Sequence, residues 1–85
     1  MANVKAKQLS PTFQQNLKAI REARDMSQRA LAIKMGSNQA TISELENGRA
    51  SPTLAMIERL CESLDVDSDV LLTAEGADIF LSATA

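Results

Sequence analysis

Apolar residues recur at helical spacing along most of this chain. One stripe, at i, i+4 and i+7, consists of Phe13, Leu17 and Ile20. A longer stripe consists of Leu54, Ile57, Leu60, Cys61 and Leu64. Residues three, four and seven apart share one face of an α-helix, so each stripe predicts a helix with one buried face. The pattern therefore predicts an all-α fold.

Two short helical patterns meet between residues 28 and 47. The inner faces of the two patterns consist of Leu31, Ala32 and Met35 in the first, and Ile42 and Leu45 in the second. Ser27 can cap the first helix, and Ser37 or Asn38 can cap the second. Gly36 stands where a tight turn needs a positive φ. This arrangement is typical of a helix-turn-helix, which usually places its second helix in the DNA major groove.

The outward face of that second helix, at residues 38–47, is short, polar and able to form hydrogen bonds. At about 100° per residue, an arc of roughly 140° holds Gln39, Ala40, Ser43, Glu44 and Asn47. Gln or Asn can pair with adenine, Ser can reach a base or a phosphate, and a methyl group can contact thymine. The alternative is an ordinary solvated helix face, but the turn and its spacing favour DNA reading.

The amino-acid composition limits the kinds of functional site that this chain can form. The 85 residues, 45% of them hydrophobic, suit one small domain with a single modest core. The chain has one cysteine and no histidine, which excludes an intrachain disulfide, a Cys/His zinc site and a histidine-based catalytic relay. Cys61 itself is most simply a core residue. We therefore expect that the protein is not an enzyme and that it has no catalytic residue, bound metal, cofactor or small-molecule substrate.

No stretch approaches the roughly 20 apolar residues of a membrane span, and the N-terminal residues do not resemble a signal peptide. We therefore expect a cytoplasmic protein with no membrane partner.

The charge is divided along the chain. Residues 1–49 carry eight basic and four acidic groups, for a charge of +4, and residues 50–85 carry one basic and seven acidic groups, for −6, so the net charge is −2. A basic front half would face phosphate, and an acidic back half would stay away from it. The asymmetry could also be incidental solvation.

The segments outside the central motif are less regular. The sequence of residues 1–9 predicts a mobile arm, in which Lys5 and Lys7 could contact DNA. The helical domain covers residues 10–72, with Ser10-Pro11 opening its first helix and Ser51-Pro52 its fourth. A short fifth helix is expected at residues 68–72. Residues 73–85 form a tail, either a strand or a packed segment, that could serve as a dimerisation element.

Residues 27–71 read SQRALAIKMGSNQATISELENGRASPTLAMIERLCESLDVDSDVL. This stretch resembles the Cro/cI-type helix-turn-helix family of phage and bacterial regulators, the xenobiotic-response-element (XRE) family. The likeness runs from about Leu17 to Leu72, and Glu46-Asn47-Gly48-Arg49 after the second helix strengthens it. The resemblance implies a compact five-helix, lambda-repressor-like domain that binds operator DNA as a homodimer and regulates transcription.

The resemblance also implies roles for individual residues. Gln28 matches a phosphate clamp, and Asn47 and Arg49 match positions that contact the DNA backbone. The positions that face base edges are Asn38, Gln39, Ala40, Ser43 and Glu44. Arg21 and Glu46 match a partly buried, structural ion pair that joins the first helix to the third.

Four residues depart from the family pattern. Asp25 and Asp65 stand where the family often has glycine, and Asp tolerates the left-handed region better than most residues. Glu44 puts a negative charge near DNA, where it can accept from cytosine or lie outside the groove. Ile33 takes a usually exposed position and would need a neighbour to cover it.

We expect a dimeric transcriptional repressor that reads double-stranded operator DNA with residues 38–47. Its half-sites would lie about one helical turn, roughly 34 Å, apart. Two alternatives remain open: an antitoxin and autorepressor of a toxin–antitoxin operon, which would also bind a toxin, and a protein-interaction adaptor that retains the fold. The operator sequence does not follow from the residues.

Overall fold

The computed structural model describes the backbone of residues 3–84 and the side chains of residues 12–83. Its helices are α1 (Asn3–Ala23), α2 (Gln28–Met35), α3 (Gln39–Glu46), α4 (Leu54–Leu64), α5 (Ser68–Leu72) and α6 (Ala74–Thr84). The described backbone holds no strand, so the all-α fold is confirmed, with one more helix than the five expected. No helix within it is both long and apolar enough to cross a membrane.

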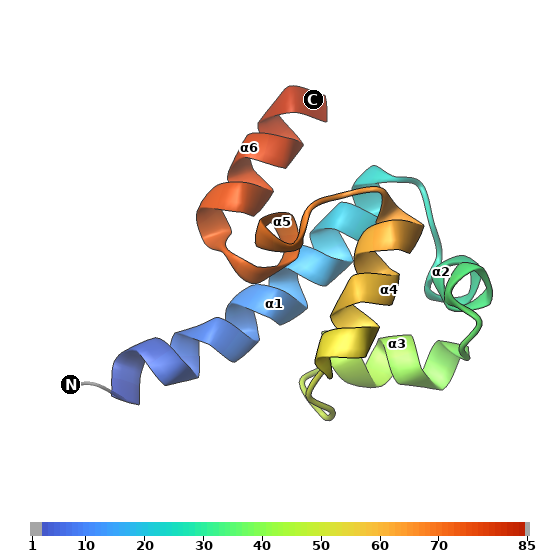
Figure 1. Ribbon diagram of the computed structural model, residues 1–85, viewed down its shortest axis with the longest axis horizontal. Coiled ribbons are helices and arrows are strands. Elements are labelled where there is room, and N and C mark those ends of the chain that lie inside the picture. Colours follow the sequence, from blue (N-terminus) through green and yellow to red (C-terminus); the bar gives the residue numbers. More distant parts are fainter. Residues whose placement is uncertain (1–2, 85) are drawn as a thin grey trace.

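Helix α1 extends across the molecule and is contacted by α3, α5 and α6, and α2 packs against α3 and α4 (Figure 1). The buried core consists of Phe13, Leu17, Ile20, Leu31, Ala32, Met35, Ile42, Leu45, Leu60, Leu64, Leu71 and Ala77. Every helix from α1 to α6 contributes to this set. Each fully buried leucine or isoleucine stabilises the fold by about 1.5–3 kcal/mol relative to an exposed one. The helix-turn-helix is therefore held on one continuous core.

The turn between α2 and α3 forms as the residues predict. Ser27 Oγ accepts from the Ala30 backbone N–H at 3.0 Å and caps α2. Asn38, rather than Ser37, caps α3. Gly36 ends α2 with φ of 72°, a left-handed conformation that costs glycine little.

Two helix starts differ from the expectation. Helix α1 begins at Asn3, so Ser10 and Pro11 lie inside it instead of opening it. Most residues between these two points are strong helix formers, which extend a helix that packing has already nucleated. Helix α4 begins after Thr53, whose Oγ1 accepts from the Met56 backbone N–H at 3.1 Å, so Ser51 is not its cap. The side chains of Lys5 and Lys7 lie outside the described residues, and the mobility expected of residues 1–9 stays a prediction.

The tail is a helix, and the alternative of a strand is wrong. Thr73 Oγ1 accepts from the Gly76 backbone N–H at 2.8 Å and opens α6. Buried Asn16 donates from Nδ2 to the Leu71 and Thr73 carbonyls at 3.0 and 2.9 Å, which ties the start of α6 to α1. Farther along, the Phe80 ring lies 4.7 Å below the Arg24 guanidinium. Residues 74–84 are thus part of the packed body.

Asp25 and Asp65 both adopt φ of 57°, as the family's glycine positions imply. Asp65 ends α4, and its backbone N–H reaches back to the last turn of that helix. Ile33, by contrast, is 67% exposed, so the neighbour expected to cover it is absent from the described residues.

We expect Asp65→Gly to raise the free energy of unfolding by about 0.5–1 kcal/mol. Glycine relieves the left-handed strain, and the change removes a negative charge from a helix C-terminus, where the dipole disfavours it. Urea unfolding followed by circular dichroism measures the difference. Asp65→Ala is the matched control: it removes the same charge but keeps a Cβ in the left-handed region, which alanine tolerates less well than aspartate, so this variant should be less stable than Asp65→Gly. Equal stability of the glycine and alanine variants would contradict this account.

Candidate nucleic-acid interface

Helix α3 presents two chemically distinct sides. Ile42 and Leu45 are 0% and 1% exposed and face the core. Gln39, Ala40 and Glu44 are exposed, and Ser43 is half-buried beside them. The helix therefore offers a polar outer side without unpacking.

The oxygen and the nitrogen of the Asn38 side-chain amide have different roles. Its Oδ1 accepts from the Thr41 backbone N–H at 3.0 Å and from Thr41 Oγ1 at 3.1 Å. The acceptor is therefore occupied by the cap. A contact from Asn38 to a base or phosphate would have to use its amide N–H groups as donors.

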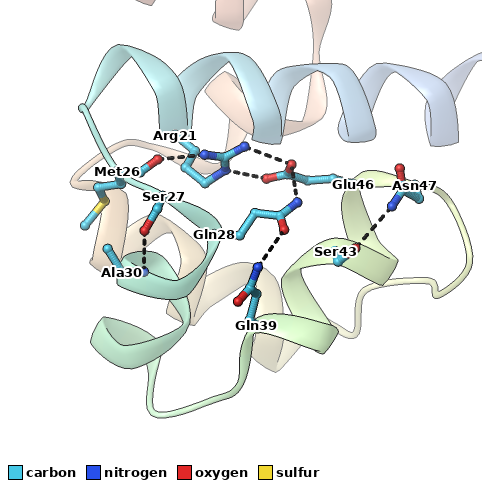
Figure 2. Close-up of polar contacts among 9 residues, drawn as sticks. All are labelled: Arg21, Met26, Ser27, Gln28, Ala30, Gln39, Ser43, Glu46 and Asn47. Atoms are coloured by element: carbon cyan, nitrogen blue, oxygen red, sulfur yellow. Dashed lines mark hydrogen bonds and ion pairs between the residues drawn. The ribbon is translucent and has the colours of Figure 1, made fainter.

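The C-terminal end of α3 holds the predicted backbone-contacting residues together. Asn47 follows α3 directly, and its Nδ2 donates to Ser43 Oγ at 3.2 Å (Figure 2). Arg49 is exposed, and its backbone N–H donates to the Glu44 carbonyl at 2.9 Å, which fixes the loop around Gly48. The Arg49 side chain can thus reach outward from a defined backbone.

The predicted ion pair between α1 and α3 is present. Arg21 Nε donates to Glu46 Oε2 at 2.6 Å, and Arg21 Nη2 donates to Glu46 Oε1 at 3.1 Å (Figure 2). A third N–H, from Nη1, reaches the Met26 carbonyl at 2.6 Å. The side chains of the pair are only 9% and 4% exposed. The hydrogen bond to Glu46 raises the pKa of Arg21 above its usual value, and burial opposes this rise.

Gln28 and Gln39 continue this network to the surface. Gln28 Nε2 donates to Glu46 Oε1 at 3.1 Å, and Gln39 Nε2 donates to Gln28 Oε1 at 3.5 Å (Figure 2). The two glutamines come from the first turns of α2 and α3. A buried ion pair, a predicted phosphate clamp and a predicted base reader thus form one connected set.

The helix-turn-helix family HTH_3 matches residues 17–71, which include all of α2, α3, α4 and most of α5. The chain belongs to this helix-turn-helix family. A similar curated protein is the uncharacterized HTH-type transcriptional regulator RghRB of Bacillus subtilis, 41% identical over 80% of this chain and 49% of that protein. Another is the uncharacterized HTH-type regulator y4dL of Sinorhizobium fredii, 40% identical over 62% of this chain and 27% of that protein. This chain therefore spans half or less of the length of these two regulators.

Solved structures show the same helix-turn-helix domain. The hypothetical transcription factor NHTF from Neisseria has a TM-score of 0.76 and 26% identity, over 86% of this chain and 84% of that one. The restriction-modification controller protein C.AhdI from Aeromonas hydrophila has a TM-score of 0.71 and 28% identity, over 74% and 96%. Hydroxypropylphosphonic acid epoxidase from S. wedmorenis is also similar, with a TM-score of 0.71 and 30% identity, but the match covers 76% of this chain and only 35% of that one. Both curated relatives are described as transcriptional regulators and the Neisseria protein as a transcription factor, and the family match shows that this chain has a helix-turn-helix domain.

The acidic residues of the back half all lie on or between α4, α5 and α6. A hollow between these helices is lined by Glu62, Asp65 and Asp67 together with the apolar side chains of Val66 and Val70. The half-buried Cys61 thiol shares this hollow, and its pKa is raised by burial and then by nearby carboxylates. The division of charge seen in the sequence is therefore also a division between helices.

Sequence reasoning missed the contacts of two residues in this helix-turn-helix domain. Arg24 Nε and Nη2 each donate at 2.9 Å, to the Leu64 and Asp65 carbonyls, and so satisfy the end of α4. A basic residue at the end of α1 gives no signal of a partner forty residues later. The bond from Gln28 to Glu46 was also missed, although the family resemblance implies a separate role for each of these residues.

Proposed function

We propose that this protein is a sequence-specific repressor that reads operator DNA in the major groove with α3. The observation that carries the proposal is the exposed polar side of α3, held outward by the buried Ile42 and Leu45. The regulators of the family supply the class of function. A homodimer in the cytoplasm would place two copies of α3 in successive grooves, about one helical turn, roughly 34 Å, apart.

Within this proposal the residues divide into readers and positioners. Gln39, Ala40, Ser43 and Glu44 face base edges, and Asn38 adds amide donors at the start of α3. Gln28, Asn47 and Arg49 contact the DNA backbone and fix the register of α3 in the groove. The Arg21–Glu46 pair holds α3 against α1.

Selection of bound sites from a random oligonucleotide pool tests the proposal. A reader of sequence enriches one roughly palindromic site, and its affinity for that site falls steeply with salt while staying well above its affinity for random DNA. Recovery of no common site, with equally weak binding to every duplex, would contradict the proposal. Sedimentation of the protein on the selected site reports whether two copies bind.

We expect Gln39→Ala to relax base preference at one position of each half-site. Loss of a bidentate contact to a base should reduce discrimination there by about 1–3 kcal/mol, while affinity for random DNA changes little. Gel-shift titration on single-substituted sites measures the effect. Gln15→Ala, which removes an exposed glutamine from α1, is the matched control and should change neither quantity. Equal loss on selected and random DNA would remove Gln39 as a base reader.

We expect Arg49→Ala to weaken binding to all duplexes alike. A lost phosphate contact removes one released counterion, so the slope of log affinity against log salt should fall by about 1. Arg59→Ala is the matched control, because Arg59 is an exposed arginine among the carboxylates of α4. A slope unchanged by Arg49→Ala, or changed equally by Arg59→Ala, would place Arg49 outside the interface.

The acidic surface of α4, α5 and α6 favours an additional or alternative role in binding a protein. An antitoxin would show both operator binding and a protein partner, whereas an adaptor would show no sequence discrimination. The same gel-shift titration against salt separates them, since an adaptor lacks both the steep slope and the preference for one site.

A further inference from the structure

Two adjoining hollows lie between α4, α5 and α6. One is the hollow lined by Glu62, Asp65 and Asp67, and the other has a volume of about 720 Å³, within the range of ligand-binding clefts, about 300–1,000 Å³. The residues that line both are Cys61, Glu62, Val66 and Asp67. The two hollows therefore form one surface, here called the acidic groove, to which no residue of α3 contributes.

The apolar side chains of the acidic groove are left partly open to solvent. The half-buried ones are Ile57, Cys61, Val66, Val70, Leu72 and Phe80. Leu54, at the start of α4, also lines the groove and is 74% exposed. Apolar side chains gathered in this way favour a second apolar surface that removes them from water.

The carboxylates of the acidic groove are unpaired. The charged residues that line the groove are the exposed Glu58, Glu62, Asp65 and Asp67 and a single cation, Arg59. Within residues 12–83, none of these four carboxylates forms a hydrogen bond or an ion pair, whereas the Glu46 carboxylate is held by Arg21. A cation from another molecule can therefore pair with them without breaking a contact that the fold uses.

The same charges disfavour a second copy of this chain as the occupant. A symmetric dimer joins the same patch of both subunits. Four carboxylates and one guanidinium from each copy would then face their own duplicates, and like charges across an interface oppose association. The charge of the groove instead complements a basic partner.

We propose that the acidic groove binds an amphipathic helix of a partner protein, with apolar side chains on one face and lysine or arginine beside them. The apolar face would cover the half-buried side chains of the groove, in the mode where anchors recur at i, i+3, i+4 and i+7. The basic residues would pair with Glu58, Glu62 and Asp67. The inference goes beyond the reading of DNA and does not depend on it, because α3 lies outside the groove.

A designed peptide of about 18 residues, long enough to form a helix, tests the proposal. It carries leucine at i, i+3, i+4 and i+7 and lysine at the other positions. A second peptide keeps every leucine and replaces every lysine by glutamate. Fluorescence anisotropy measures the affinity of the full chain for each peptide. The lysine peptide should bind, more weakly as salt rises, and the glutamate peptide should bind at least about tenfold more weakly.

Two double variants place the binding in the groove. Glu62→Gln with Asp67→Asn removes two charges from the groove and should weaken binding of the lysine peptide by about fivefold or more. Glu75→Gln with Asp78→Asn is the matched control, because it removes the same charge from exposed positions of α6 outside the groove. The control should change the affinity by less than about twofold. All four side chains are exposed, and circular dichroism checks that both variants keep the fold.

An NMR titration with the lysine peptide should shift the methyl signals of Ile57, Val66 and Val70 most and leave the amide signals of α3 in place. No binding of the lysine peptide, equal affinity for the two peptides, or equal weakening by the two double variants would overturn the inference. Changes in the same methyl signals on dilution of the free protein, with no response to the lysine peptide, would show that a second copy covers the groove and would overturn it as well.

Discussion

Arg21→Ala is expected to lower the free energy of unfolding by about 3–5 kcal/mol, a large part of the total for so small a domain. The substitution leaves the Glu46 carboxylate with a side chain only 4% exposed and without its cation. It also leaves the Met26 carbonyl without the N–H of Arg21. Burial of an uncompensated charge costs more than the ion pair itself contributes. Urea unfolding followed by circular dichroism measures the loss.

The double variant Arg21→Met with Glu46→Leu is the control for that interpretation. Because it removes both charges together, it should be less destabilised than Arg21→Ala and could approach the stability of the wild-type protein. If the double variant lost as much free energy of unfolding as the two single substitutions together, the unpaired carboxylate would not be the main cost. Arg24→Ala, which removes an exposed arginine directly after α1, should cost less than Arg21→Ala.

Leu45→Ala is expected to lower the free energy of unfolding by about 2–5 kcal/mol. Leu45 is 1% exposed and anchors the inner side of α3 to the core. Truncation removes buried methyl groups and leaves a cavity that the neighbouring helices fill only in part. The same loss should loosen α3, so affinity for the selected site should fall at temperatures where the wild-type domain still binds fully. Thermal unfolding with and without the selected duplex measures both effects.

Leu54→Ala provides the matched control, because Leu54 is 74% exposed at the start of α4. The same chemical change there should alter stability by no more than about 0.5 kcal/mol. Comparable losses at the two leucines would mean that Leu45 does not hold α3 as the structure indicates.

Much of the fold could be predicted from residue patterns. The turn at Gly36, the cap at Ser27 and the ion pair of Arg21 with Glu46 each depend on local spacing or on a specific family motif, and all three are present. The left-handed Asp25 and Asp65 follow from the same motif. The turn, the cap and the left-handed aspartates are predictable because neighbouring residues determine them, whereas the ion pair joins residues 25 positions apart and follows only from the family motif.

Apart from the starts of α1 and α4, the misses concern contacts between residues far apart in the chain. Helix α6 exists because Thr73 caps it and Asn16, from α1, holds its start, and a short apolar run cannot distinguish that packing from a strand. The link from Gln28 to Glu46 needs the angle between α2 and α3, which no residue spacing supplies. The roles of the outer residues of α3 toward DNA remain predictions, since they depend on a partner outside the chain.

An NMR titration of the protein with its selected duplex tests the central proposal most directly. The account predicts that the largest shifts of backbone and side-chain amide signals fall on Gln28 and residues 38–49, with the acidic residues of α4 and α5 little changed. Shifts confined to α4, α5 and α6, with the Gln39 side-chain amide unchanged at saturation, would contradict the claim that α3 reads DNA.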